Sequence, residues 1–179
     1  MGCDKALLEF AGRPLLRRAI ELASAVAQEV KIVGDPVRHA GFGVVVTDIY
    51  PGRGPLGGIH AALTSSNTDL NLILATDLPF VAPDFLQYLV ANAQASDALV
   101  TVPKINQYFE PLCAVYRKRF AEVAEGALSG GKNKVDALFA EEITRVISEE
   151  AMVLAGFDPA MFRNLNTPDD LARAQTALA

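Results

Sequence analysis

The sequence predicts one α/β domain, residues 1–179, with a mainly parallel β-sheet. Short apolar runs alternate with segments of helical period along the chain, as in α/β domains. The apolar runs have no polar face, which is typical of strands that helices cover on both sides. The 179 residues, 51% hydrophobic and 21% charged, suffice for one sizeable core, and no linker, repeat or low-complexity tract divides them.

Strands are expected at the short apolar runs, which are too short for helices and rich in β-branched residues. The run with the clearest consequence is NLILAT, because an acidic residue follows it directly. The predicted strands are 31–34, 43–47, 71–76, 98–103 and 113–116.

The first predicted helix covers about 14–28, where apolar residues recur at steps of three and four. Further helices are expected at 57–65, 83–95, 117–128 and 134–141, and the pair Glu149–Glu150 fits a solvated helix start. A last helix is expected from Thr167, with Pro168 in the first helical position. A helix therefore precedes the first predicted strand, and the usual leading strand of such a sheet is not found.

Charge and cysteine content narrow the function classes. A formal net charge of −5 without a Lys/Arg run gives no general attraction to nucleic acid or to an anionic membrane. Cys3 and Cys113 form no metal-binding or redox motif, which fits a reducing compartment. No stretch reaches the ~20 apolar residues of a membrane span, and the N-terminus does not have the form of a signal peptide. We therefore expect a cytoplasmic protein without general affinity for nucleic acid or membranes.

The segment NLILATDLPFVAPDF contains the strongest candidate for a metal ligand. Its strand ends in Asp77, so this carboxylate is expected at the carboxyl edge of the sheet, where open α/β sheets bind ligands. Mg²⁺ is often held there by one or two acids together with phosphate oxygens. The alternative is that Asp77 only stabilises a turn.

A second candidate is the segment TDIYPGRGPLGGIHAAL. Asp48 follows a predicted strand, and a loop with four glycines then leads into a helix. Glycines allow close backbone approach, and a helix N-terminus presents free N–H groups, so a base or a phosphate could bind here. Asp48 could accept a hydrogen bond from a ribose hydroxyl or a base N–H. A plain connection without a ligand is equally compatible with this segment, and His60 within the helix is expected to be a packing or surface residue.

Two other polar segments are less specific. The segment GALSGGKN resembles a P-loop, but it follows a helix and ends in Asn133 instead of Ser or Thr, so we reject that assignment. Lys132 within it could still meet an anionic ligand or lie in solvent. Asn164 and Asn166 occupy alternate positions of an extended segment, so both could bind one polar ligand or serve as turn residues.

Taken together and in order, four segments resemble the MobA-type molybdenum cofactor guanylyltransferases across nearly the whole chain. They are MGCDKALL (followed by GRPLL), GPLGGIHAAL, ATDLPFV and NLNTPDDL. The resemblance implies a three-layer Rossmann-like nucleotidyltransferase fold. It also implies transfer of GMP from GTP to molybdopterin or its molybdenum-loaded form, with release of pyrophosphate.

The resemblance also implies roles for single residues. Gly2 would belong to the phosphate loop and Lys5 would contact the GTP phosphates. Asp48 would bind the nucleotide, and Asp77 would bind the nucleotide through Mg²⁺, the implied cofactor; Lys5 and Asp77 would be the catalytic pair.

The acceptor side is implied in the same way. Asn164, Asn166 and Lys132 would lie near the pterin. The implied partners are GTP and molybdopterin or molybdenum-molybdopterin, followed by cofactor-insertion proteins and molybdoenzymes, with no nucleic acid and no membrane.

The sequence departs from the family pattern at its start. The family signature LAGGxSxR and the strand before it are absent from the 179 residues, so we expect the first strand and part of the phosphate loop to be missing from this chain. Gly34–Asp35 also differs from relatives that place an Asn after that strand. The alternatives are a cytidylyltransferase of the same cofactor, a sugar-phosphate nucleotidyltransferase, and a non-catalytic molybdopterin-binding or delivery protein.

Overall fold

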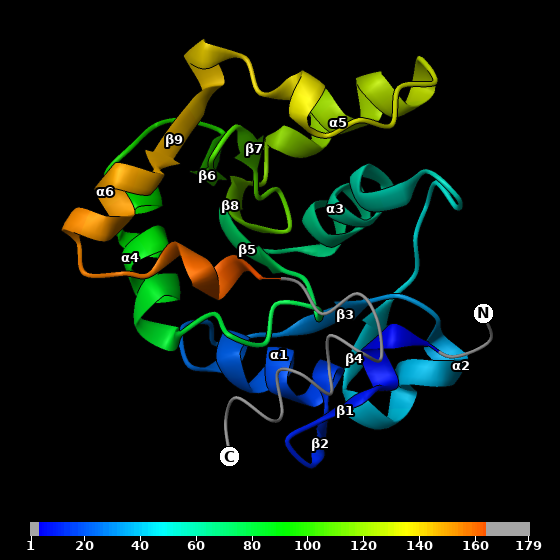
Figure 1. Ribbon diagram of the computed structural model, residues 1–179. Helices are drawn as coiled ribbons and strands as arrows, with labels where there is room; N and C mark the ends of the chain where they lie inside the picture. Colours follow the sequence, from blue (N-terminus) through cyan, green and yellow to red (C-terminus); the bar gives the residue numbers. More distant parts are fainter. Residues whose placement is uncertain (1–3, 164–179) are drawn as a thin grey trace.

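The computed structural model describes residues 4–163 as an α/β structure (Figure 1). The α-helices of this part are α1 (Leu15–Ser24), α2 (Pro36–His39), α3 (Gly54–Ser65), α4 (Pro83–Gln94), α5 (Phe120–Ser129) and α6 (Glu149–Leu154). The 3₁₀ turns are η1 (Lys5–Leu7), η2 (Ala40–Phe42), η3 (Asp136–Leu138), η4 (Glu141–Ile143) and η5 (Pro159–Phe162). The strands are β1 (Glu9–Phe10), β2 (Arg13–Pro14), β3 (Lys31–Val33), β4 (Val44–Val46), β5 (Leu70–Leu74), β6 (Val100–Ile105), β7 (Tyr108–Phe109), β8 (Cys113–Arg117) and β9 (Thr144–Ser148).

The largest sheet is mixed. Strand β8 lies antiparallel between β5 and β6, while β9 pairs parallel with the other edge of β6. Strands β5, β6 and β9 therefore run in one direction, and their carboxyl ends meet at one edge of the sheet. This agrees with the predicted α/β class, and β8 and the short β7 run against the parallel set.

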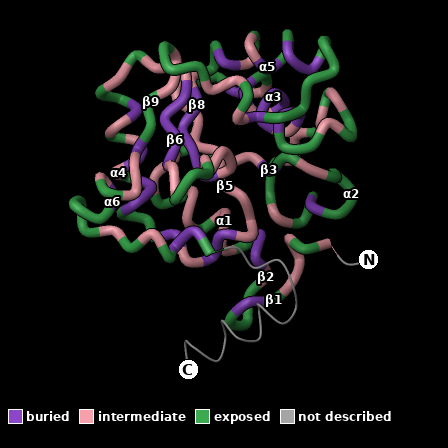
Figure 2. Tube along the Cα trace, turned by 45° about the horizontal axis from the view of Figure 1, so that its top comes forward, coloured by how far each residue is buried: buried purple, intermediate pink, exposed green. Residues whose placement is uncertain are grey.

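Helices cover both faces of this sheet, which gives three layers. On one face, Ala114 and Tyr116 of β8 pack with α3 and α5. On the other face, Cys113 and Val115 of the same strand pack with α4, α6 and η5. The buried stretches of β6, β8 and α3 form the centre of the molecule (Figure 2). Alternation along β8 thus serves two cores, which explains why the strand sequence has no polar face.

Strands β3 and β4 form a separate parallel pair. Strand β5 hydrogen-bonds to β8 on one side, and within residues 4–163 no strand pairs with its other edge. The hairpin β1–β2 turns through Ala11 and Gly12, which both have positive φ.

Four predicted helices need correction: the one at about 14–28 ends at Ser24, and the one at 57–65 begins at Gly54. The segment 134–141 forms no α-helix, because Val135, Leu138 and Phe139 pack onto the core as a 3₁₀ turn followed by extended backbone. So short a segment cannot sustain an α-helix by its own propensity, and packing decides. The helix predicted at 117–128 begins at Phe120, because Arg117 still belongs to β8.

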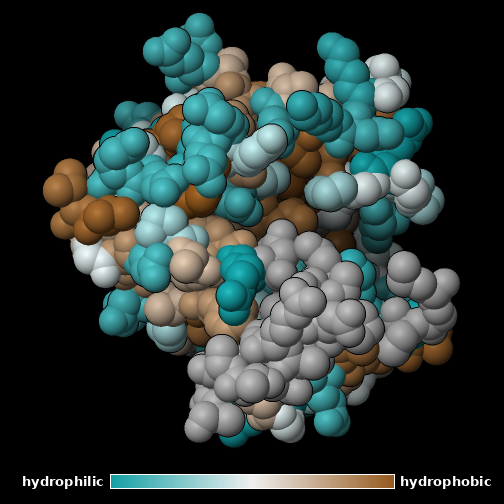
Figure 3. Space-filling model, in the orientation of Figure 1, coloured by the Kyte–Doolittle hydropathy of each residue, from teal (hydrophilic) through white to brown (hydrophobic). Residues whose placement is uncertain are grey.

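None of the helices in the described part is long and apolar enough to cross a bilayer. Exposed hydrophobic side chains gather at the end of α6 (Figure 3), where Val153 and Leu154 are 56% and 88% exposed.

Candidate functional site

The loop after β5 carries Asp77 and lies beside the N-terminal segment. The rings of Phe10 and Phe80 meet edge to face with centroids 5.6 Å apart, and the Arg18 guanidinium donates to the Pro79 carbonyl at 3.3 Å. Leu8 and Leu15 complete this small cluster. The segment that begins with Lys5 therefore packs against the loop that contains Asp77, although more than 70 residues separate the two in sequence.

Asp77 is half-buried, and no hydrogen bond or ion pair engages its carboxylate within residues 4–163. Glu110, on the turn before β8, lies within electrostatic reach of it. The pKa of Glu110 is raised from its ordinary 4.5 to about 7. Burial is the largest cause, and the negative charges of Asp77 and Asp136 add to it. The edge of the sheet around Asp77 is therefore locally negative, and a cation bound there would relieve the repulsion.

We predict that Glu110 makes stability depend on pH. A carboxyl whose pKa is raised in the folded state stabilises the fold below about pH 4.5, and this contribution is lost as the pH rises to about 7. Because Glu110 is only half-buried, the loss should be on the order of 1 kcal/mol. The free energy of unfolding, measured with urea in EDTA at several pH values from 4.5 to 7, should fall less steeply with pH for Glu110→Gln than for wild type. Glu125→Gln, at an exposed position of α5, is the control; equal slopes in all three proteins would contradict the prediction.

Asp48 lies at the amino end of α3. Its Oδ1 accepts from the backbone N–H of Tyr50 at 2.9 Å, and its carboxylate lies against the Cα of Gly57 in the first turns of the helix. A Cβ on Gly57 would be 2.8 and 2.9 Å from the two carboxylate oxygens and 3.0 Å from the Tyr50 carbonyl oxygen. A negative charge is favourable at this end of a helix, and the missing side chain at Gly57 is what admits it.

We predict that Gly57→Ala displaces Asp48, because the new methyl group would overlap with the carboxylate and with backbone. The resemblance implies that Asp48 binds the nucleotide, and on that expectation nucleotide affinity should fall by roughly tenfold, the magnitude of one lost charge-assisted hydrogen bond. Gly58→Ala is the matched control, since a Cβ there would meet only Val33 Cγ1 at 3.7 Å. Calorimetric titration with GTP measures both; equal affinities for the two variants would refute the role of Gly57.

Lys5 is exposed at the start of η1 and forms no ion pair within the described part of the chain. Asp4 is the N-cap of this turn and accepts from the Ala6 N–H at 3.1 Å. The same carboxylate binds His39 of α2. The turn that carries Lys5 is therefore fixed at its base, while its ammonium group is exposed and has no ion-pair partner within residues 4–163.

The loop with Lys132 ends α5. Gly131 has a φ of +77°, and the Lys132 N–H donates to the Ala127 carbonyl at 2.9 Å, which is a glycine helix cap. This confirms the rejection of the P-loop, because the loop leaves a helix. Lys132 itself is exposed, and its neighbour Asn133 accepts from Arg53 of the glycine-rich loop at 3.4 Å.

The other predicted residues divide into three groups. Gly2, Asn164 and Asn166 lie outside the described residues, as do Cys3 and the last predicted helix. His60 is buried against Tyr50, as expected for a packing residue. The prediction of a helix start at Glu149–Glu150 is confirmed, with Ser148 as the N-cap of α6.

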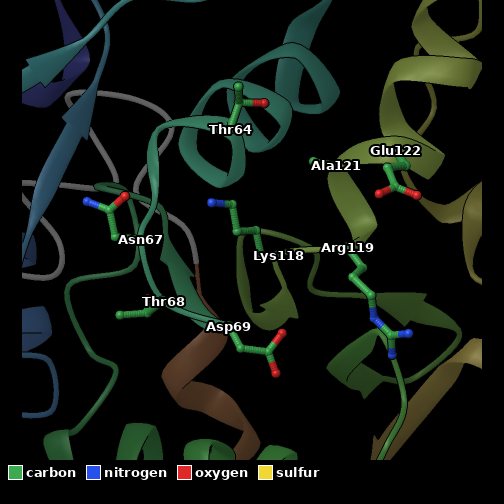
Figure 4. A pocket seen from close by; sticks show the side chains of 8 residues that line it. All are labelled: Thr64, Asn67, Thr68, Asp69, Lys118, Arg119, Ala121 and Glu122. Atoms are coloured by element: carbon green, nitrogen blue, oxygen red, sulfur yellow. The ribbon is translucent and has the colours of Figure 1, made fainter.

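An open hollow of about 470 Å³ lies at the opposite end of β5 from Asp77 (Figure 4). None of the predicted site residues lines it. Its lining is mostly polar or charged. The lining residues are Thr64, Asn67, Thr68, Asp69, Lys118, Arg119, Ala121 and Glu122. Because it lies at the other end of β5 and shares no lining residue with the candidate site, the hollow is separate from that site.

Two residues of the candidate site escaped the sequence analysis. Glu110 lies 33 residues beyond Asp77, and only the pairing of β5 with β8 places them at one edge. The sequence around His39 gives no sign of its role, because its partner Asp4 lies 35 residues earlier in the chain. The only local sign of Glu110 was an acidic residue three positions before the predicted strand 113–116.

Known proteins with the same sequence pattern cover nearly all of this chain. It is 37% identical over 179 residues to a probable molybdenum cofactor guanylyltransferase of Pelotomaculum thermopropionicum, covering 98% of this chain and 85% of that protein. It is 32% identical over 179 residues to a molybdenum cofactor guanylyltransferase of Desulfosudis oleivorans, with 99% and 88% covered.

Solved structures show the same similarity. The crystal structure of molybdopterin-guanine dinucleotide biosynthesis protein A from Archaeoglobus fulgidus superimposes with a TM-score of 0.83 at 27% identity, covering 99% of this chain and 91% of that one. The family model described as the MobA-like NTP transferase domain matches residues 1–146. This match, together with the relatives that cover nearly the whole chain, shows that the chain belongs to the family of MobA-like NTP transferases.

Proposed function

We propose that this protein transfers GMP from GTP to the terminal phosphate of molybdopterin, or of its molybdenum-loaded form, in the cytoplasm. The observation that carries the proposal is the near full-length similarity to proteins named molybdenum cofactor guanylyltransferase. The placement of Asp77, Asp48 and Lys5 on loops beside the strand ends and at a helix N-terminus supports it, because such positions suit a nucleotide.

The residues around Asp77 fit a magnesium ion that is shared with the substrate. Within residues 4–163 no group of three or more acidic, histidine or cysteine side chains forms a protein-only metal cage. Mg²⁺ at nucleotide sites usually has one or two carboxylates and completes its shell with phosphate oxygens and water. The carboxylate of Asp77, which no hydrogen bond or ion pair engages within residues 4–163, would supply such a donor beside the half-buried Glu110. When bound, Mg²⁺ would neutralise negative charge on the phosphates.

The chain's own residues would then supply alignment and charge. The acceptor phosphate is already a nucleophile: its oxygen forms a bond to the α-phosphorus of GTP while the bond to the β-phosphate oxygen breaks and pyrophosphate leaves. In this reaction the obstacles are repulsion between anions and their orientation. Lys5 would neutralise phosphate charge, and Asp48 would orient the nucleoside. No general base is needed, which is consistent with the chemistry of these residues.

The test is a pyrophosphate-release assay with purified protein, Mg²⁺ and molybdopterin, in which each nucleoside triphosphate is supplied in turn. We expect GTP to be preferred over CTP, with loss of turnover in EDTA and recovery on adding Mg²⁺. A preference for CTP would replace the guanylyl assignment by a cytidylyl one, and turnover with a sugar phosphate instead of molybdopterin would change the acceptor. Binding of molybdopterin without turnover of any triphosphate would indicate a carrier protein. Cofactor-insertion proteins and molybdoenzymes would be the recipients of the product.

A further inference from the structure

The turn that carries Lys5 is held through both carboxylate oxygens of Asp4. Oδ1 accepts from the Ala6 N–H at 3.1 Å and caps the turn from within. Oδ2 accepts from His39 Nε2 at 2.9 Å, a contact between side chains 35 residues apart. Exposed Arg38 approaches the same oxygen at 4.0 Å. The cap is therefore anchored to α2 by one close, well-buried donor.

His39 is placed for this contact by its surroundings. The residue is only 7% exposed, and a Cβ on Gly34 would be 2.7 Å from His39 Nδ1 and 3.0 Å from Cε1, so the Nδ1–Cε1 edge of the ring lies against Gly34. A carboxylate can only accept, so Nε2 carries the proton in this hydrogen bond. The buried Nδ1 has no partner within residues 4–163. The ring thus has one polar contact, and it is directed at Asp4.

This contact joins two parts of the candidate site. Gly34 extends the pairing of β3 and β4 through its N–H to the Val46 carbonyl at 3.0 Å. Asp48 follows β4 by two residues. The chain of contacts from Gly34 through His39 to Asp4 therefore sets the place of the Lys5 turn relative to the strand pair that carries Asp48.

We propose that His39 is a positioning residue: by binding Asp4 it holds the turn of Lys5 where Lys5 can reach the phosphates of the nucleotide. This inference rests on the proposed function for the nature of the ligand. The attachment of the turn to His39 rests on the contacts alone and is testable without any substrate.

The first experiment measures amide hydrogen exchange by NMR on the full chain without ligand. In His39→Leu, the amides of Ala6 and Leu7 should exchange roughly tenfold faster, the size expected for loss of a helix cap, while the amides of β6 and β8 are unchanged. His39→Gln, which can donate from its side-chain amide, should restore protection. His60→Leu is the control, because His60 is equally buried but lies in α3. Unchanged or already unprotected Ala6 and Leu7 amides, or equal acceleration in His60→Leu, would overturn the proposal.

The second experiment separates positioning from stability. His39→Leu should lower kcat/KM for GTP roughly tenfold in the wild-type background and have almost no effect in the Lys5→Ala background, because Lys5 is the group through which it acts. Equal losses in both backgrounds would show a merely structural role and overturn the proposal. Absence of GTP turnover in the wild-type protein would instead refute the proposed function, and the exchange experiment would still decide whether His39 holds the turn.

Discussion

Asp77→Ala should reduce guanylyl transfer by about 10³-fold while the protein stays folded. The carboxylate is the proposed protein ligand of Mg²⁺. A bound metal lowers the free energy of a phosphoryl-transfer transition state by several kcal/mol, and each 1.36 kcal/mol corresponds to a factor of ten in rate. The fold should tolerate the change, because no hydrogen bond or ion pair within residues 4–163 engages Asp77. Removing its charge also relieves Glu110, so the pKa of Glu110 should fall toward its ordinary value.

Two variants give this result its meaning. Asp77→Asn keeps the shape and removes the charge, so it should lose nearly as much activity and should need more Mg²⁺ for half-maximal rate. Asp84→Asn changes an exposed acid in the first turn of α4, seven residues further on, and should remain active. Turnover and its Mg²⁺ dependence are measured by pyrophosphate release, and folding by circular dichroism. A near-normal rate for Asp77→Ala would remove Asp77 from the metal site.

Lys5→Ala should reduce kcat/KM for GTP by roughly 10²-fold, the usual cost of losing one charged group that stabilises a transition state. The side chain is exposed at the start of η1, so stability should hardly change. Lys5→Arg should recover part of the activity, because the charge remains but the geometry differs.

Lys118→Ala is the matched control for Lys5. This exposed lysine lines the hollow at the other end of β5 and should leave turnover unchanged. A titration with increasing salt adds a second measure, because an exposed lysine acts on phosphates through a screened charge. If Lys5→Ala and Lys118→Ala were equally active, the phosphate contact of Lys5 would be refuted.

Much of the fold could be predicted from the sequence because its strands are apolar on both faces. Cys113 and Val115 serve one core, Ala114 and Tyr116 the other, so the run could only be a strand between two helical layers. Strand β9 was missed because it lies at an edge, where only Ile147 is buried and its residues show no apolar run. The segment 134–141 was wrongly predicted as a helix because its apolar residues have helical spacing. In the structure these residues instead pack on the core from a 3₁₀ turn.

The candidate site was predictable wherever a residue's position followed from its own segment. Asp77 follows the predicted strand 71–76, which in the structure ends at Leu74, and Asp48 precedes a glycine-rich helix start, so local pattern indicated the positions of both. From the sequence, Gly57 could be interpreted only as a glycine that allows close approach of the backbone. The structure shows instead that it gives room to the Asp48 carboxylate, because a Cβ would come within 2.9 Å of both oxygens.

The sequence by itself determined the α/β class, the alternation of strands and helices, and the acids that end the strands, since these depend on periodicity and on neighbours in the chain. Only the tertiary structure decided that Glu110 shares an edge with Asp77 and that His39 binds Asp4. Both pairs join residues more than 30 positions apart, and their energies come from burial and from contacts that exist only after the chain has folded. Local pattern carries no record of such partners, because either residue would satisfy its own segment equally well without the other.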